Sequence, residues 1–294
     1  PAAQARVYCR ESLLALRASK MHEIGDPMRA YALSTFCMLC CVPPLAAVLT
    51  AQWGWRVALG VLAVSCALLM LVAAHFMLRD PESVGLTPDG DPLPAGGTLT
   101  ATGYGIRECL RLRPFWLLTA IYTTTWLVVF VPFVHAVAMA KDLGLSTFAA
   151  ASVLSAIGIG GVAGRLSSGL MLDRFGYMPT MLGIFALQAA AFGLFATADS
   201  LPSLWAAGTL FGYAFGGGVT ALAPLCSVLF GRAHVASIVG AIFAFAAAPS
   251  ALGPYLAGWL YDATGTYALV FLIAAALNGL AFLLTLALAA QLRR

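Results

Sequence analysis

Arg165 is the basic residue of this sequence that falls inside a long apolar stretch. In a helix it would lie about 12 Å further along the axis than Asp173, because each residue adds about 1.5 Å. Placing a guanidinium in hydrocarbon costs at least about 2.5 kcal/mol, so such a group normally faces a cavity, a partner or a ligand. A guanidinium binds a carboxylate through two parallel hydrogen bonds. The sequence therefore offers Arg165 as an anion-binding residue, or as a residue that packs against a loop or a helix end.

Other polar side chains in apolar stretches could also touch a ligand. Tyr122 and Trp126 bound a polar and aromatic patch, and His135 follows near the end of the same stretch. An imidazole titrates near neutral pH, so His135 is either a proton site or a structural contact. Gln188 and Asn278 are single polar groups, for which hydrogen bonds between helices are as good an explanation as substrate contacts.

The motifs of common enzyme sites are absent. The sequence has no phosphate-binding loop, no G-x-S-x-G and no His pair at metal-binding spacing, and the apolar stretches hold no Asp or Glu in their interiors. Cys37, Cys40 and Cys41 lie in an apolar run without a second cysteine or histidine pair, so they are interpreted as packing residues. We therefore expect no enzyme activity, no cofactor and no metal.

The elements that carry these residues are predicted to be transmembrane helices. The chain of 294 residues is 61% hydrophobic and only 10% charged, whereas soluble domains carry about 25% charged residues. A helix needs about 20 mostly apolar residues to cross a bilayer. Eight stretches reach that length, at about Tyr31–Leu49, Val57–Leu78, Phe115–Ala138, Phe148–Leu172, Thr180–Ala198, Leu204–Phe230, Ala236–Tyr261 and Tyr267–Ala289. The fold class is thus an all-α integral membrane bundle.

The basic residues predict the orientation of these helices. With the amino terminus in the cytoplasm, thirteen Arg and Lys residues fall inside and only Arg56 and Lys141 outside. Positive residues concentrate in cytoplasmic loops, so both termini are expected in the cytoplasm. The basic residues are also scattered and form no single face, which argues against a nucleic-acid partner.

The domain organisation follows from the loop lengths. We expect a cytoplasmic segment over 1–30, two transmembrane helices over 31–78, a cytoplasmic central loop over 79–114 with a short surface helix near Tyr104–Leu112, and a six-helix bundle over 115–294. The segment from Pro43 loosely matches that from Gly253, in the same orientation. Such a parallel repeat relates the two halves of some transporters. On that basis the chain corresponds to helices five to twelve of a twelve-helix protein.

The segment from Gly164 to Gly176 reads G-R-L-S-S-G-L-M-L-D-R-F-G. Its G-x-x-x-D-R-x-G part resembles the signature loop of the major facilitator superfamily, in the copy of the carboxyl-terminal half. The resemblance implies a bundle of that superfamily, in which Gly169, Asp173, Arg174 and Gly176 control conformation. Gly169 would permit close helix approach, and Gly176 a tight turn. The alternative is a generic positively charged turn.

Further segments resemble bacterial carriers of the monocarboxylate and oxalate–formate group. They are R-D-P-E-S-V-G-L-T-P-D-G-D from Arg79, F-V-H from Phe133, and G-P with D-A-T-G-T-Y from Gly253 to Tyr267. In that group a substrate-binding Arg precedes a Gly by four residues, as Arg165 precedes Gly169. Some relatives carry an Asp where this chain has Gly161, which leaves proton coupling open.

The resemblance implies a secondary transporter of small organic anions such as monocarboxylates, working by alternating access. It would lie in the plasma membrane, or in the inner membrane of a bacterium, with the lipid bilayer and the anion as its partners. Arg165, Tyr122, Trp126 and His135 are the expected substrate-binding residues. The alternative is a truncated chain that does not transport or that depends on a partner.

Overall fold

The computed structural model describes residues 49–50, 52–72, 74 and 103–292 of the chain. They belong to two compact units, Pro1–Thr100 and Ala101–Arg294. Seven helices among the described residues are long and apolar enough to cross a membrane. This confirms the all-α membrane fold. The first expected span, Tyr31–Leu49, lies outside the described residues except for Leu49. The expected cytoplasmic segment over 1–30 and residues 79–102 of the expected central loop over 79–114 also lie outside them.

The described part of the first unit contains a single long helix, at Gln52–Val72. It begins before the expected start at Val57. Nearly all of its large apolar side chains are exposed, including Trp53, Leu69 and Met70. Such a surface suits a helix that meets lipid or other helices on every side.

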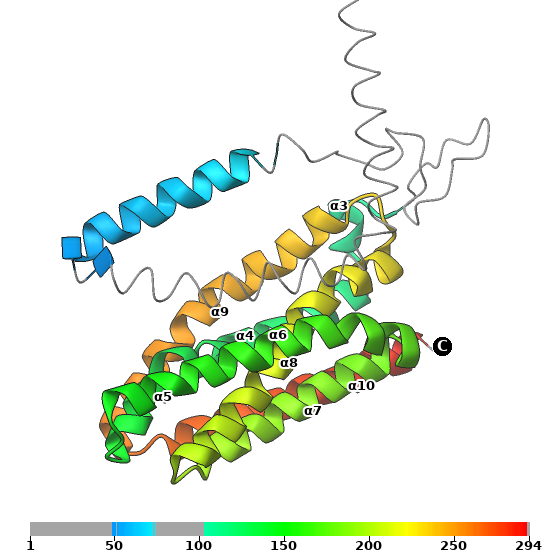
Figure 1. Cartoon of the computed structure of the whole chain (residues 1–294). Coiled ribbons are helices and arrows are strands. Elements are labelled where there is room, and N and C mark those ends of the chain that lie inside the picture. Colours follow the sequence, from blue (N-terminus) through cyan, green and yellow to red (C-terminus); the bar gives the residue numbers. More distant parts are fainter. Residues whose placement is uncertain (1–48, 51, 73, 75–102, 293–294) are drawn as a thin grey trace, which may run out of the picture. The chain divides into compact units, whose positions relative to one another are not determined.

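The described part of the second unit contains one short helix and the helices of six spans (Figure 1). Their bounds are α3 at Ile106–Cys109, α4 at Arg113–Val129, α5 at Val131–Asp142, α6 at Thr147–Phe175, α7 at Tyr177–Ala196, α8 at Leu201–Phe230, α9 at Val235–Thr264 and α10 at Ala268–Leu292. The helix α3 lies where a short surface helix was expected.

The third expected span is interrupted in its middle. It runs from Arg113 to Asp142 but breaks at Phe130 into α4 and α5. Pro132 stands in the first turn of α5. A proline has no N–H to donate, so the helix is weakened there and a new helix start is tolerated. The expected span thus forms one crossing, with a one-residue interruption at Phe130 that divides it into α4 and α5.

The short turns of the second unit end its helices sharply. Ser146 caps α6 by accepting a hydrogen bond from the Ala149 N–H at 3.2 Å. Gly176 joins α6 to α7 with a φ of 81°, a conformation that costs other residues free energy. Thr180 secures this turn, because its hydroxyl lies 2.8 Å from the Gly176 carbonyl and 3.0 Å from that of Met171.

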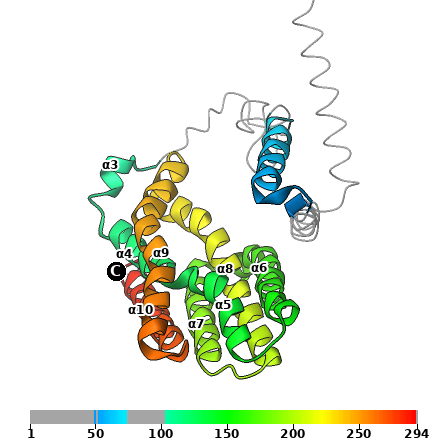
Figure 2. The same cartoon turned by 90° about the vertical axis from the view of Figure 1, so that its left-hand side faces the viewer.

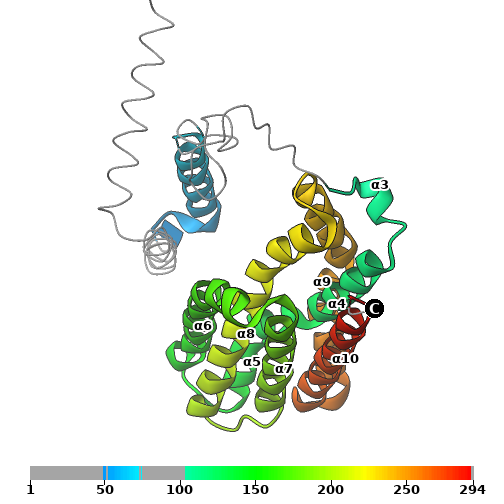
Figure 3. The same cartoon turned by 90° about the vertical axis from the view of Figure 1, so that its right-hand side faces the viewer.

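Each of the six spans packs against spans that follow or precede it and against spans further away in the sequence. The most extensive contact joins α6 to α8; α7 packs on α8 and α10, and α4 packs on α9 and α10. Figures 2 and 3 show the resulting groups, with α6, α7 and α8 together and α4, α9 and α10 together. Two clusters of buried apolar side chains fill the interior, around Phe211 and around Phe115.

The bundle has two distinct ends. One, called here the α3 end, carries α3, the start of α4, the turn at Gly176 and the last residues of α10; the other, the far end, carries the turns at Gly144 and Gly265. The Tyr104 N–H donates to the Phe230 carbonyl at 2.9 Å. This backbone bond ties the segment before α3 to the end of α8.

Candidate functional site

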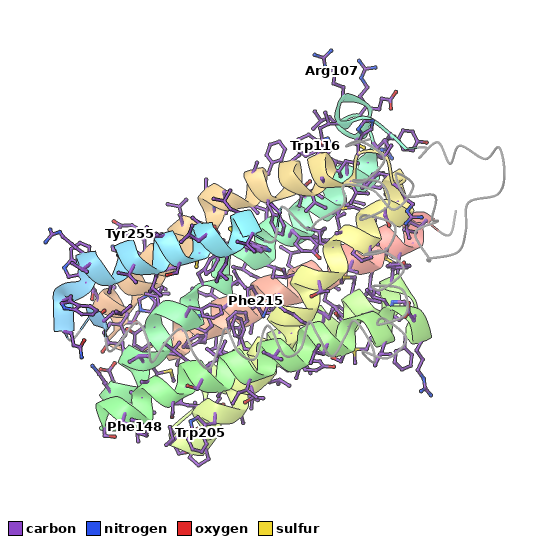
Figure 4. The ribbon with its side chains drawn as sticks, turned by 45° about the horizontal axis from the view of Figure 1, so that its top comes forward. Arg107, Trp116, Phe148, Trp205, Phe215 and Tyr255 are labelled. Carbon is purple, nitrogen blue, oxygen red and sulfur yellow. The ribbon has the colours of Figure 1, made fainter. Side chains whose placement is uncertain are left out.

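Arg165 lies on α6 at mid-length of the bundle. Its guanidinium carbon is 6.0 Å from the centroid of the Phe215 ring on α8. Figure 4 shows Phe215 between the end that carries Arg107 and Trp116 and the end that carries Phe148 and Trp205. The Arg165 side chain is half-buried. The charge therefore sits deep between the two ends and not at either surface.

Gly161 leaves room for the Arg165 head group. A Cβ placed on Gly161 would lie 3.6 Å from Nη1 of Arg165, which is an ordinary van der Waals distance. The side chain thus extends back along α6 by about one turn toward the helix start, as side chains of α-helices do. No side-chain hydrogen bond or ion pair of the guanidinium is found among the described residues.

Glycines bring the backbone of α6, which carries Arg165, into direct contact with the backbone of α8. A Cβ on Gly160 would collide with the carbonyl oxygen of Thr209, one on Gly164 with that of Tyr213, and one on Gly212 with that of Ile157. The two backbones touch directly, which is how small residues hold helices together in membranes. Phe215 projects from this fixed helix beside Arg165.

Aromatic rings continue from Phe215 toward α4. Phe215 stacks on Phe211 with an interplanar angle of 6° and contacts the Phe133 ring at 5.5 Å between centroids. Trp126 packs against Phe130 and Phe243, at 5.6 Å and 4.9 Å. Trp126 and Phe215 line one small cavity of about 10 Å³, which has room for about one water molecule. Arg165 and Trp126 thus both lie near Phe215.

Tyr122 lies in the packing between α4 and α8. Its side chain is only 2% exposed, and its hydroxyl donates to the Gly218 carbonyl at 2.9 Å. Its ring contacts those of Phe185 and Phe243. The donor of Tyr122 is therefore already used within the protein, although the residue also lines the small cavity.

Replacing Tyr122 by Phe separates these roles. We expect Tyr122→Phe to lower the free energy of unfolding by about 0.5–1.5 kcal/mol through the lost hydrogen bond. Affinity for a small anion should change by less than about twofold, since the ring remains. Thermal unfolding and equilibrium binding of the purified variant check this. A large loss of affinity with unchanged stability would instead make the hydroxyl a ligand contact.

His135 is held away from these residues, by α9 and the start of α10. Its Nε2 lies 2.9 Å from the Pro254 carbonyl and its Nδ1 3.3 Å from the Tyr267 hydroxyl. Because a carbonyl only accepts, Nε2 carries a proton, and in the neutral ring Nδ1 accepts from Tyr267. Burial, aided by the charge of Asp142, raises the pKa of the Tyr267 phenol, which keeps it a neutral partner. The contacts of His135 are those of a residue that joins helices near the far end.

Buried polar atoms without a partner occur deeper in the bundle. They are Oγ1 of Thr125, Nε2 of Gln188 and Oδ1 of Asn278. The Asn278 amide donates to Ala274 on its own helix at 3.0 Å. Gln188 and Asn278 therefore make none of the expected hydrogen bonds between helices within the described residues. Thr125 and Gln188 both line the small cavity beside Trp126.

The loop that resembles a family signature lies at the α3 end. Gly176 forms the turn, as expected. Asp173 and Arg174 are exposed, and the Arg174 guanidinium lies 5.8 Å from the Phe175 ring. Apart from its chain neighbours and the nearby backbone of α6, no described residue comes within 4 Å of a Cβ placed on Gly169. The close helix approach expected at Gly169 is therefore made at other glycines within the described part of the chain.

Sequence reasoning missed Phe215 and the glycines of α8 as partners of α6. Their signal was present as the small residues Gly208, Gly212 and Gly216, spaced four apart. This spacing indicates a helix-packing face but does not say which helix it meets.

Comparison with known proteins identifies the fold. A sequence model described as Major Facilitator Superfamily matches residues 28–248 and 129–293. The chain is 31% identical to monocarboxylate transporter 13 of Bos taurus over 247 residues, which is 83% of this chain and 55% of that protein. It is 32% identical to monocarboxylate transporter 11 of Mus musculus over 237 residues, or 75% of this chain and 49% of that protein. The chain thus spans about half the length of these curated relatives.

Proposed function

Since the chain belongs to the major facilitator superfamily, whose members are membrane transporters, we propose that it is a secondary carrier of small organic anions such as monocarboxylates. It would work by alternating access, in which two bundles rock about a site near the middle of the membrane. The names of its relatives, monocarboxylate transporters 11 and 13, support the substrate class.

The observation that carries this proposal is the position of Arg165. A cation at mid-length of a membrane bundle, with no acidic partner among the described residues, is costly unless it is matched by a ligand or by water. A small carboxylate would supply the missing charge. Its two oxygens fit the two parallel N–H groups of a guanidinium, and the low dielectric strengthens that contact.

The apolar part of the anion would meet the rings beside Arg165. The Phe215 centroid lies 6.0 Å from the guanidinium carbon, and Phe215 and Trp126 line one small cavity, whose lining does not include Arg165. Tyr122 would complete the wall with its ring. His135 would act from the far end by holding α5 against α9. Rings near a cation favour short carboxylates with small apolar groups.

The turn between α6 and α7 would control the conformation of the carrier. Asp173 and Arg174 leave their charged groups exposed there, and Gly176 fixes the turn. Exposed opposite charges at a helix junction can pair with another bundle in one state and release it in the other.

The proposed orientation places the α3 end in the cytoplasm. Within the described part of the second unit this end carries Arg107, Arg111, Arg113, Arg174 and Arg232, whereas the far end carries Lys141. This distribution follows the positive-inside rule. It supports a cytoplasmic central loop and cytoplasmic termini.

Equilibrium binding tests the substrate class. The purified chain in detergent is titrated with lactate and with lactamide, which has the same shape but no charge. We expect saturable binding of lactate and at least about tenfold weaker binding of lactamide, because the charged hydrogen bonds to Arg165 are lost. Equal affinity for both compounds would rule out a carboxylate site at Arg165.

Gly161→Asp is expected to weaken anion binding at every pH from about 5 to about 7.5. The new carboxylate would stand beside the Arg165 guanidinium, which lowers the pKa of the new group and pairs with it. Because an Asp ordinarily titrates at about pH 3.9 and this one would titrate lower, it stays ionised over the whole range and competes with pyruvate for Arg165. Titrations of wild type and variant with pyruvate at several pH values check this. Equal affinities for the two proteins, or recovery of the variant at about pH 5, would contradict it.

A further inference from the structure

A groove opens at the α3 end between the first turn of α4 and the last turns of α10. Its volume is about 850 Å³, and the residues that line it include Arg111, Arg113, Trp116, Leu117, Ala287 and Ala290. Figure 4 shows Trp116 of this groove apart from Phe215, the ring beside Arg165. We call it the α4–α10 groove.

The groove combines two kinds of surface. Arg111 and Arg113 are exposed, and their guanidinium groups make no hydrogen bond or ion pair with the described residues. Leu117, Ala287 and Ala290 give an apolar wall from the two membrane spans. A ligand that fits must therefore be anionic at one end and apolar along its length.

Trp116 lies between the basic surface and the apolar wall of the groove. Its indole N–H donates to the Leu110 carbonyl at 2.9 Å, and its ring packs on Phe245 at 5.4 Å between centroids. Its side chain is still 47% exposed. Tryptophan prefers the boundary between hydrocarbon and headgroups, so the arginines lie at headgroup level when the spans cross a bilayer.

We propose that the α4–α10 groove binds a phospholipid with an anionic headgroup. The headgroup phosphate would lie between Arg111 and Arg113, and an acyl chain would lie along Leu117 and Ala290. Basic pockets between membrane helices on the cytoplasmic side recognise such headgroups, because anionic lipids enrich that leaflet. A free phosphate ion would use the arginines but leave the apolar wall empty, and therefore explains less of the groove.

Native mass spectrometry of the whole chain tests this proposal. The probes are dioleoylphosphatidylglycerol and dioleoylphosphatidylcholine, added to the protein in detergent. The Arg111→Gln/Arg113→Gln variant should bind the phosphatidylglycerol about tenfold more weakly and the phosphatidylcholine about equally to wild type. The matched control is Arg107→Gln/Arg232→Gln, which removes two exposed charges from the same end without touching the groove.

A filling variant tests the apolar wall separately. Ala290→Trp keeps both arginines but occupies the space beside them, and it should also weaken phosphatidylglycerol binding. Size-exclusion profiles check whether each variant is folded. If the double variant is misfolded, the binding of phosphatidylglycerol by Ala290→Trp decides the outcome of the test. Equal losses in the groove variant and the Arg107/Arg232 control, unchanged binding by Ala290→Trp, or complete displacement of the lipid by inorganic phosphate would each overturn the proposal.

Discussion

Arg165→Ala is expected to weaken the binding of a small carboxylate by at least about a hundredfold. A hydrogen bond to a charged group contributes about 1.5–3 kcal/mol, and the variant removes both donors of the guanidinium. Phe215 would remain as an apolar neighbour but cannot replace the charge. Equilibrium titration of purified wild-type and variant protein with lactate measures the difference.

Two further variants show whether the loss of lactate binding is specific to Arg165. Arg165→Lys keeps the charge but not the paired N–H groups, so it should fall between wild type and Arg165→Ala. Arg232→Ala removes an exposed arginine at the α3 end and should bind normally. If Arg165→Ala bound lactate as tightly as Arg232→Ala, Arg165 would be a structural residue.

Gly160→Ala is expected to destabilise the bundle far more than its size suggests. The added Cβ would collide with the Thr209 carbonyl of α8, and a backbone atom cannot turn aside as a side chain can. The two helices would have to separate, at a cost of about 1–3 kcal/mol or more. Thermal unfolding of the protein in detergent, followed by tryptophan fluorescence, checks the stability.

The neighbouring glycine provides the control. A Cβ on Gly161 would meet its nearest atoms, in Arg165 and Gly212, at 3.6 Å and 3.7 Å, so Gly161→Ala should leave the melting temperature nearly unchanged. Both substitutions add one methyl group to α6. Since both replace Gly by Ala, the change in helix propensity is the same in the two variants. Equal melting temperatures for the two variants would show that the α6–α8 contact is looser than described.

The transmembrane helices could be predicted because the bilayer sets one simple criterion. The apolar stretches beginning near Phe148 and Leu204 match α6 and α8 closely, since short turns fix where each helix must stop. The ends of the helices were predicted less accurately. The length of an apolar stretch does not show where a turn residue such as Gly176 or Gly231 reverses the chain.

The break at Phe130 shows why prolines are hard to interpret in such a sequence. Pro132 begins a new helix, yet Pro224, Pro249 and Pro254 lie inside α8 and α9 without ending them. Neighbouring helices can satisfy the backbone groups that a membrane proline frees. Only the packing around each proline decides between a bend and a break.

The candidate site was predictable in its charge but not in its surroundings. A lone arginine in an apolar stretch stands out in any sequence, whereas Phe215 became its neighbour only through the contact of α6 with α8. The same contact distinguishes Gly160 and Gly164, which touch α8, from Gly169, which meets no described residue. Sequence alone shows that glycines are present but not which face of the helix is covered.

Uptake by proteoliposomes tests the central claim most directly. The chain is reconstituted in liposomes, and the entry of labelled lactate is compared for wild type, Arg165→Ala and Arg232→Ala. The account predicts saturable uptake by wild type and Arg232→Ala, and its loss in Arg165→Ala. Equal uptake by all three proteins, or lactate binding by the wild-type chain without any uptake, would contradict the claim that this chain carries small anions through a site at Arg165.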